Sequence, residues 1–402
     1  MKVSKTDETS LWSVFTIFLR LGLTSFGGPV AHLAYFRDEF VVRRAWLSER
    51  NYADLVALCQ FLPGPASSQV GLSIGLYRQG YRGALAAWLG FTLPSAIALI
   101  CFANVIASDG ALLSPLVLQG LKIVVLAVIA QAVWGMARSL CPDRARQSVM
   151  VVTACLMLWQ PSAVMPLIVI ALGAIVGLWL YPLKLSADNG CLFVHVGRRA
   201  GALWLLLFAV LLVLLPLLSA WLPGSTIMML FDAFYRVGSL VFGGGHVVLP
   251  LLQAEVVPSG LVSNDVFLAG YGAAQAVPGP LFTFAAFLGA SMNQGATGWV
   301  GGAICLVAIF LPSFFLVAGA LPFWQQLRLN NKVQAALLGV NAAVVGLLLA
   351  TLYQPAWTSA IKSPLDFGWA LLAFMALVFW KLPPWLVVLG SGLLGGFVSL
   401  LA

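Results

Sequence analysis

The sequence predicts an all-α polytopic membrane protein built from two inverted-topology repeats with broken, re-entrant helices. Of the 402 residues, 61% are hydrophobic and 8% are charged, whereas soluble domains carry about 25% charged residues. Mean hydropathy is +0.99. Uncharged runs at 84–107, 200–222 and 298–323 exceed the roughly 20 residues that cross a bilayer. Helix-breaking motifs also occur twice, and such duplicated breaks are typical of membrane transporters.

The duplicated motifs follow the same order in both halves. The sequence Pro63-Gly64-Pro65 with Gln60 before it returns as Pro278-Gly279-Pro280 with Gln275 before it. Upstream, Arg20-x-Gly22 and Phe26-Gly27-Gly28 return as Arg236-x-Gly238 and Phe242-Gly243-Gly244. Downstream, Leu93-Pro94-Ser95 returns as Leu311-Pro312-Ser313. In a bilayer, such breaks are tolerated only where they are buried in protein or line a water-filled cavity.

The chain divides into a first repeat at 1–183, a linker with one extra transmembrane helix at 184–225, and a second repeat at 226–402. The loop Arg37–Arg50 holds four arginines, and its counterpart 253–265 holds no basic residue. The bias reverses at 108–114, whose counterpart 324–332 carries Arg328 and Lys332. Basic residues mark cytoplasmic loops, so the halves are predicted to be inverted, with a cytoplasmic N-terminus. The sequence leaves open whether the broken segments are re-entrant or cross the membrane fully.

The breaks are predicted to form an anion site at mid-membrane. A broken helix exposes N–H groups at the start of its second arm, and these groups with the helix dipole attract anions. Glycines at a break let a ligand approach the backbone closely. We expect substrate contacts from the break residues Gly27, Gly28, Gly243, Gly244, Pro63, Gly64, Pro65, Pro278, Gly279 and Pro280, and from the polar side chains Gln60, Ser68, Gln275 and Thr283. The alternative is that proline and glycine only shape helix packing.

Three cations lie within apolar runs. Arg20 and Arg236 are repeat equivalents, and a guanidinium binds oxyanions through two parallel hydrogen bonds. We predict that the two arginines bind a dianion between the halves. Snorkelling to the interface, or pairing with Asp232, is the alternative for them. Lys122 lies opposite Asn341 and is predicted to be a second contact or a gate, with snorkelling again the alternative.

Four titratable residues are candidates for proton coupling. Glu39 and Glu255 are equivalent and follow the Phe-Gly-Gly breaks, although a solvated loop carboxylate would have the same pattern. His32 and His246 follow the two breaks, and histidine titrates near neutrality. Packing or a backbone hydrogen bond is the alternative for both histidines.

Several function classes have no support in the sequence. The six cysteines occur singly, and no metal-ligand or cofactor-binding spacing is present. We therefore predict no metal and no cofactor. The net charge of +8 is assigned to cytoplasmic loops, and with no soluble domain to carry a basic surface we predict no nucleic-acid partner; the partner is the lipid bilayer, and a homodimer is left open. Gly71-Leu72-Ser73-Ile74-Gly75 matches the serine-hydrolase pattern GxSxG, but an apolar helix lacks the strand–turn–helix context of that motif. An intramembrane hydrolase using Ser73 is thus a minor alternative, and we predict a transporter rather than an enzyme.

The Phe26-Gly27-Gly28-Pro29 region and the two Pro-Gly-Pro motifs, in two halves of this length, resemble the long, two-domain members of the chromate ion transporter family. The resemblance implies a multi-pass protein of the bacterial inner (plasma) membrane. It further implies a secondary transporter that exports chromate, driven by the membrane potential or proton gradient, and that gives chromate resistance. Sulfate or another anion is the alternative substrate. The chain departs from strict repetition where Pro29 stands opposite Gly245 and Lys122 opposite Asn341.

Overall fold

The computed structural model describes residues 10–108, 115–162, 164–180, 196–222, 224–242, 245–293, 295–328 and 330–401. These residues form helices and connecting turns, with no β-strand among them. Within these ranges, five helical segments are long and apolar enough to cross a membrane: 66–107, 117–140, 198–221, 298–323 and 331–360. The predicted all-α membrane fold is therefore confirmed.

In its described residues, the first half consists of seven helices and one π-helical turn. They are α1 (Leu11–Thr24), α2 (Gly28–Arg37), the π-helical turn η1 (Asp38–Arg43), α3 (Glu49–Phe61), α4 (Ala66–Ser108), α5 (Pro115–Leu140), α6 (Arg144–Trp159) and α7 (Met165–Leu180). Gln79 and Gly80 have non-helical backbone angles, so α4 consists of two arms at 66–78 and 81–108. A single helix, α8 (Arg198–Trp221), precedes the second half.

The described part of the second half has more, shorter elements. It contains α9 (Thr226–Leu240), η2 (Gly245–Val247), α10 (Val248–Val256), α11 (Asn264–Ala276), η3 (Leu281–Thr283), α12 (Phe284–Ala290), α13 (Gly298–Ala320), η4 (Leu321–Phe323), α14 (Trp324–Arg328), α15 (Asn331–Thr351), η5 (Leu352–Trp357), α16 (Thr358–Ala360), α17 (Pro364–Val378) and α18 (Pro384–Leu401). Serine caps begin equivalent helices: the Ser48 side chain accepts from the α3 backbone and the Ser263 side chain from the α11 backbone.

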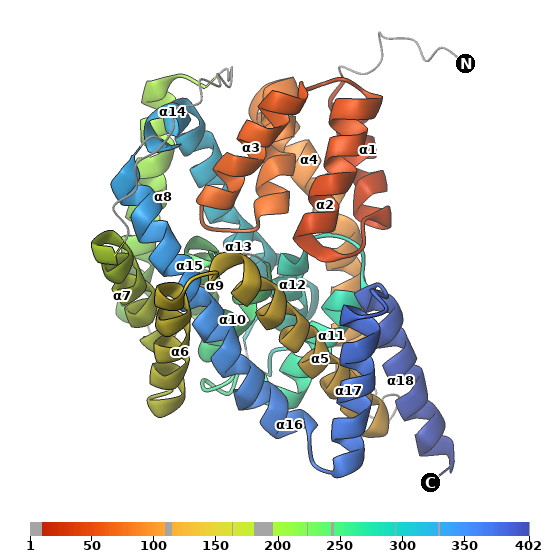
Figure 1. The fold of residues 1–402 in the computed structure, drawn as a ribbon. Helices are drawn as coiled ribbons and strands as arrows, with labels where there is room; N and C mark the ends of the chain where they lie inside the picture. The colour runs from red at the N-terminus through yellow and green to blue at the C-terminus, as the bar shows by residue number, and fades with distance from the viewer. Residues whose placement is uncertain are drawn as a thin grey trace.

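Helices of the two halves are packed into one body. In Figure 1, α1 to α3 lie at one end, α17 and α18 at the other, and α15 runs diagonally between them. α1 packs along α4, and its equivalent α9 packs along α13. Gly22 and Gly238 permit these approaches, because a Cβ at either position would meet the backbone carbonyl of Phe91 or Ile309. This contact explains the glycine of the repeated Arg-x-Gly motif.

Candidate functional site at the helix breaks

All four predicted breaks interrupt the helices. α1 ends at Thr24 before α2 begins at Gly28, and α3 ends at Phe61 before α4 begins at Ala66. α9 ends at Leu240, and α11 ends at Ala276 just before the second Pro-Gly-Pro motif. Gly243 and Gly244 lie outside the described residues.

The breaks of one half are hydrogen-bonded to the breaks of the other. The Gly64 N–H donates to the carbonyl of Val241 at 2.7 Å, and the Gly279 N–H donates to the carbonyl of Ser25 at 3.0 Å. Ser25 and Val241 are the C-caps of the equivalent helices α1 and α9, so the exchange is reciprocal. Because helix ends leave carbonyls without intrahelical partners, each half supplies a donor to the other. The breaks therefore converge, as the sequence predicts.

The two Pro-Gly-Pro glycines are shaped for this contact. Gly64 and Gly279 have φ of +120° and +107°, a region that residues with a side chain rarely adopt. A Cβ on Gly64 would lie 2.6 Å from Ser313 Oγ, and one on Gly279 would lie 2.8 Å from Ser95 Oγ. Each Leu-Pro-Ser motif thus receives the turn of the opposite half. The amides of Gly64 and Gly279 are used in this contact, so they are not free donors for a ligand.

Two adjoining cavities lie beside the breaks. They share Gly27, Gln131, Ala132, Gly135 and His246. The first cavity, about 460 Å³, is further lined by Gly28, Val128, Trp134, Gln275, Leu377, Val378, Lys381, Leu382, Pro383 and Pro384. The second cavity, about 590 Å³, is further lined by Pro29, Leu33, Cys59, Gln60, Leu62, Gly64, Ala66, Met136, Ser139, Leu140, Gly245 and Asn341.

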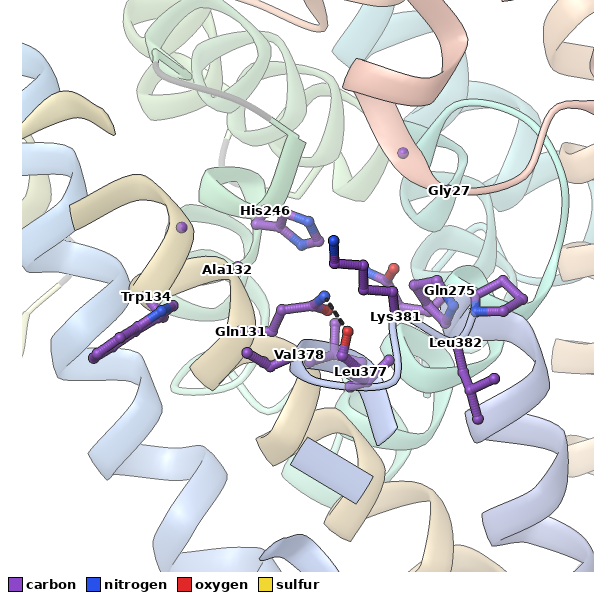
Figure 2. Close-up of a pocket in the computed structure, with 15 residues that line it drawn as sticks. Gly27, Gln131, Ala132, Trp134, His246, Gln275, Leu377, Val378, Lys381 and Leu382 are labelled. Carbon is purple, nitrogen blue, oxygen red and sulfur yellow. Dashed lines mark hydrogen bonds between the residues drawn. The ribbon is translucent and has the colours of Figure 1, made fainter. Parts of the chain in front are cut away.

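The first cavity is lined by the cationic side chain of Lys381 and by the amide side chains of Gln131 and Gln275. Figure 2 shows the Lys381 ammonium group pointing toward the imidazole of His246, with Gln131 and Gln275 nearby. Gln131 Nε2 donates to the Leu377 carbonyl at 3.2 Å, whereas the buried Gln275 Nε2 has no hydrogen-bond partner. Among the described residues that line the two cavities, Lys381 has the one permanent charge. The first cavity therefore offers an electropositive site with Gln275 in its wall.

His246 and the start of α2 add donors to the same wall. His246 Nδ1 lies 2.7 Å from the Tyr271 hydroxyl, so a hydroxyl that donates to Nδ1 leaves Nε2 protonated. The N-cap of α2 is Gly27, which supplies no side-chain cap. The N-terminus of this ten-residue helix carries partial positive charge and lies at the cavity wall through Gly27 and Gly28.

Lys381 holds a strained backbone conformation in the turn between α17 and α18. Its φ is +54°, in the left-handed region that costs residues with a Cβ about 1–2 kcal/mol. Glycine usually occupies such a position after a helix. Sequence reasoning treated Lys381 only as a loop charge and did not single out Gln131. The available signals were a lone lysine between apolar segments and an amide in the middle of a span.

The two predicted arginines form ion pairs and do not line either cavity. Arg20 Nη2 lies 2.7 Å from Glu39 Oε2, and Arg236 Nη2 lies 3.3 Å from Glu255 Oε2 and 3.1 Å from Asp232 Oδ2. Glu39 also accepts from Arg43 and from Arg44, whose Nε is 2.6 Å away. Burial acts to raise the pKa of Glu39, but Arg44, with Arg20 and Arg43, holds it below its usual range.

The remaining predicted residues divide between the cavity and its surroundings. Thr283 Oγ1 donates to the Pro280 carbonyl at 2.7 Å, and the Ser68 hydroxyl is buried without a partner. His32 lies against Ser67 Oγ and the Ser25 carbonyl. Lys122 Nζ lies 2.6 Å from Asp265 Oδ1. Pro63, Pro65, Pro278 and Pro280 frame the turns and do not line the cavities.

Ser73 lies in the first arm of α4 and is buried. Its hydroxyl donates to the Gln69 carbonyl at 2.8 Å and lies 3.8 Å from Cys59 Sγ. A nucleophilic serine needs an adjacent general base, and within the described part of the chain neither a histidine nor a carboxylate is hydrogen-bonded to it.

Comparison with known proteins identifies the family. The model of the family described as "Chromate transporter" matches residues 12–178 and 228–396. The chain belongs to the chromate transporter family. Its members similar to this chain include the "Chromate transport protein" of Pseudomonas aeruginosa, 31% identical over 96% of this chain and 92% of that protein. The "Uncharacterized transporter MJ0718" of Methanocaldococcus jannaschii is 29% identical over 87% of this chain and 85% of its own length.

The family also includes shorter chains. The "Uncharacterized transporter YwrA" of Bacillus subtilis is 30% identical over 95% of its own length but only 42% of this chain. No solved structure matches this chain. The family consists of transporters, which agrees with the prediction that this protein is not an enzyme.

Proposed function

We propose that this protein carries chromate across the bacterial inner membrane, out of the cytoplasm. The observation that carries the proposal is the first cavity, where Lys381, Gln275 and the start of α2 meet beside interlocked helix breaks. Membership of the chromate transporter family supports the same substrate class. Non-helical backbone lining a cavity is the form that transporter substrate sites take in membranes.

In this proposal, Lys381 neutralises charge on the anion, and the neutral hydrogen-bond donors orient it. A tetrahedral dianion accepts hydrogen bonds on every oxygen, so one ammonium, one amide and one imidazole N–H fit three of them. Lys381, Gln275 and His246 come from α17–α18, α11 and the second break respectively, so the anion would join separate elements. The open N-terminus of α2 adds a further favourable dipole.

Arg20 and Arg236 have a structural role in this proposal. Arg20 lies on α1 and Glu39 follows α2, so their ion pair ties the two arms of the first hairpin. Arg236 on α9 and Glu255 on α10 tie the second hairpin in the same way. Since both pairs also span the same number of residues, we propose that the sequence repeat at these arginines preserves the hairpins rather than a ligand contact.

The membrane potential would favour export. Each charge moved through 100 mV contributes about 2.3 kcal/mol, so a dianion leaving a negative-inside cell gains about 4.6 kcal/mol per 100 mV. Export therefore needs no other driving force, and it would give chromate resistance. The orientation in this proposal rests on the loop charges, which favour a cytoplasmic N-terminus and an inverted second half.

The test is chromate uptake by everted vesicles under an imposed potential. Lys381→Gln is expected to lower the initial rate at least tenfold. Lys332→Gln, which removes an exposed lysine at the start of α15, is the matched control and should leave the rate unchanged. Equal rates in the two variants would refute the site.

Sulfate is the alternative substrate, because it is also a tetrahedral dianion. Excess sulfate should compete weakly with chromate if chromate is the substrate. Uptake of sulfate that chromate does not inhibit would replace the chromate proposal.

A further inference from the structure

The equivalent helices α3 and α11 have different neighbours. Both have 13 residues, start after a serine cap and end before a Pro-Gly-Pro motif. α11 packs against α5 and α18, in an apolar cluster that joins Ala269 with Leu121 and Val388. By chain order, α15 and α7 are the equivalents of α5 and α18. No comparable packing joins α3 to α15 or α7 among the described residues.

The second cavity occupies the place where that packing is missing. Gln60 on α3 and Asn341 on α15 line the two sides of the cavity. In the other half, the equivalent of Asn341 is Lys122. Its side chain is 6% exposed and pairs with Asp265 on α11, which is 62% exposed. Gln60 and its equivalent Gln275 both line a cavity, but Asn341 faces the second cavity whereas its equivalent Lys122 is held in an ion pair.

We propose that the structure is one of two alternating-access states, with Lys122–Asp265 as the latch of the closed side. This inference rests on the proposed transport function and adds its mechanism. In the second state, α3 packs on α15 and α7, while α11 separates from α5 and α18. Because the halves are built alike, the helix packing of the two arrangements is similar, and the main difference is the Lys122–Asp265 pair, which Asn341 cannot reproduce. The substrate site between them is then reached from opposite faces in turn.

Gly272 and Leu121 provide a way to lock the closed side. A Cβ on Gly272 would lie 3.8 Å from Leu121 Cβ, within the range of about 3.5–4.5 Å found in disulfides. In a chain whose six native cysteines are replaced by serine, Leu121→Cys with Gly272→Cys should cross-link on oxidation. Chromate transport should then stop, and it should return after the disulfide has been reduced and the reductant, which would itself consume chromate, has been removed. A fully cross-linked protein that transports at the uncross-linked rate would overturn the proposal.

The equivalent pair on the open side reports the second state. Ala57→Cys with Val340→Cys, placed by the same repeat offsets, should be joined by a thiol-specific cross-linker only as the protein cycles. Failure of this pair to cross-link in cycling vesicles, when the first pair does so, would refute the alternation. Cross-linking needs no identified substrate. If both pairs cross-link but no chromate is transported, the proposed substrate is wrong, and the alternation between two states is still supported.

A charge exchange tests the latch itself without a disulfide. In the chain without native cysteines, Gln131→Cys places a probe where both cavities meet, and an impermeant maleimide is applied from the face that carries Asp265. Lys122→Asp should speed labelling about tenfold, and Lys122→Asp with Asp265→Lys should restore protection. Unchanged labelling in the single variant would show that the pair is not the latch.

Discussion

Replacing Lys381 by glycine should stabilise the protein while abolishing its transport. At φ of +54°, the lysine backbone costs about 1–2 kcal/mol that glycine does not incur. Glycine loses about 0.5–1 kcal/mol through the greater freedom of the unfolded chain. The difference is a net gain of about 0.7 kcal/mol. Because the same change removes the cation from the first cavity, chromate uptake should fall at least tenfold.

Ala45 supplies the matched control. It has φ of +50° in the loop after η1 and lines neither cavity. Ala45→Gly should therefore raise stability by a similar amount and leave uptake unchanged. Stability is measured by unfolding in detergent and transport in everted vesicles. A folded Lys381→Gly protein that transports at the normal rate would refute the role of Lys381.

Three further predictions follow from particular contacts. Glu39→Gln should destabilise the protein by about 3 kcal/mol, the low end for breaking a buried ion pair, because two of its arginine partners are half exposed. The pKa of Glu39 is lowered in the folded protein. Its stabilising effect is therefore complete above the ordinary carboxyl pKa and is lost as pH falls through the lower folded value. Unfolding midpoints measured against pH should show this loss of stability at acid pH in the wild type and not in Glu39→Gln. Gly64→Ala should lower the unfolding free energy by at least about 1–2 kcal/mol, because alanine is strained at positive φ. Adding Ser313→Ala should recover only part of that loss, since it removes the Oγ contact but not the strain. Full recovery would show that the backbone conformation contributes nothing. Gln275→Leu should lower uptake without loss of stability, since its Nε2 has no protein partner, whereas Gln131→Leu should lower the unfolding free energy by about 1 kcal/mol by removing its bond to Leu377.

The sequence predicted the helices and their breaks because proline, glycine and hydrophobic run length act locally. Each Pro-Gly-Pro break lies where the pattern placed it. The repeat also predicted that the breaks meet, although the partner of each Gly N–H depends on tertiary packing. For the same reason, no local pattern shows that Gly64 bonds Val241 rather than a ligand.

The charges were harder to place from sequence. Arg20 and Arg236 stand out because they lie in apolar runs, but a buried charge needs a partner, and Glu39 and Glu255 are too far along the chain for a helical pattern to connect them. Lys381 has no repeat counterpart, so the duplication that revealed the breaks gave no signal for it. Its place in the cavity depends on how α17 and α18 pack against α5.

The crossed bonds between Gly64 and Val241 and between Gly279 and Ser25 mean that neither half is chemically complete. Expressed alone, either half would have one glycine amide and one carbonyl without mates in an environment that offers no water to replace them. Co-expression of the severed halves should therefore restore the two hydrogen bonds that each half lacks on its own.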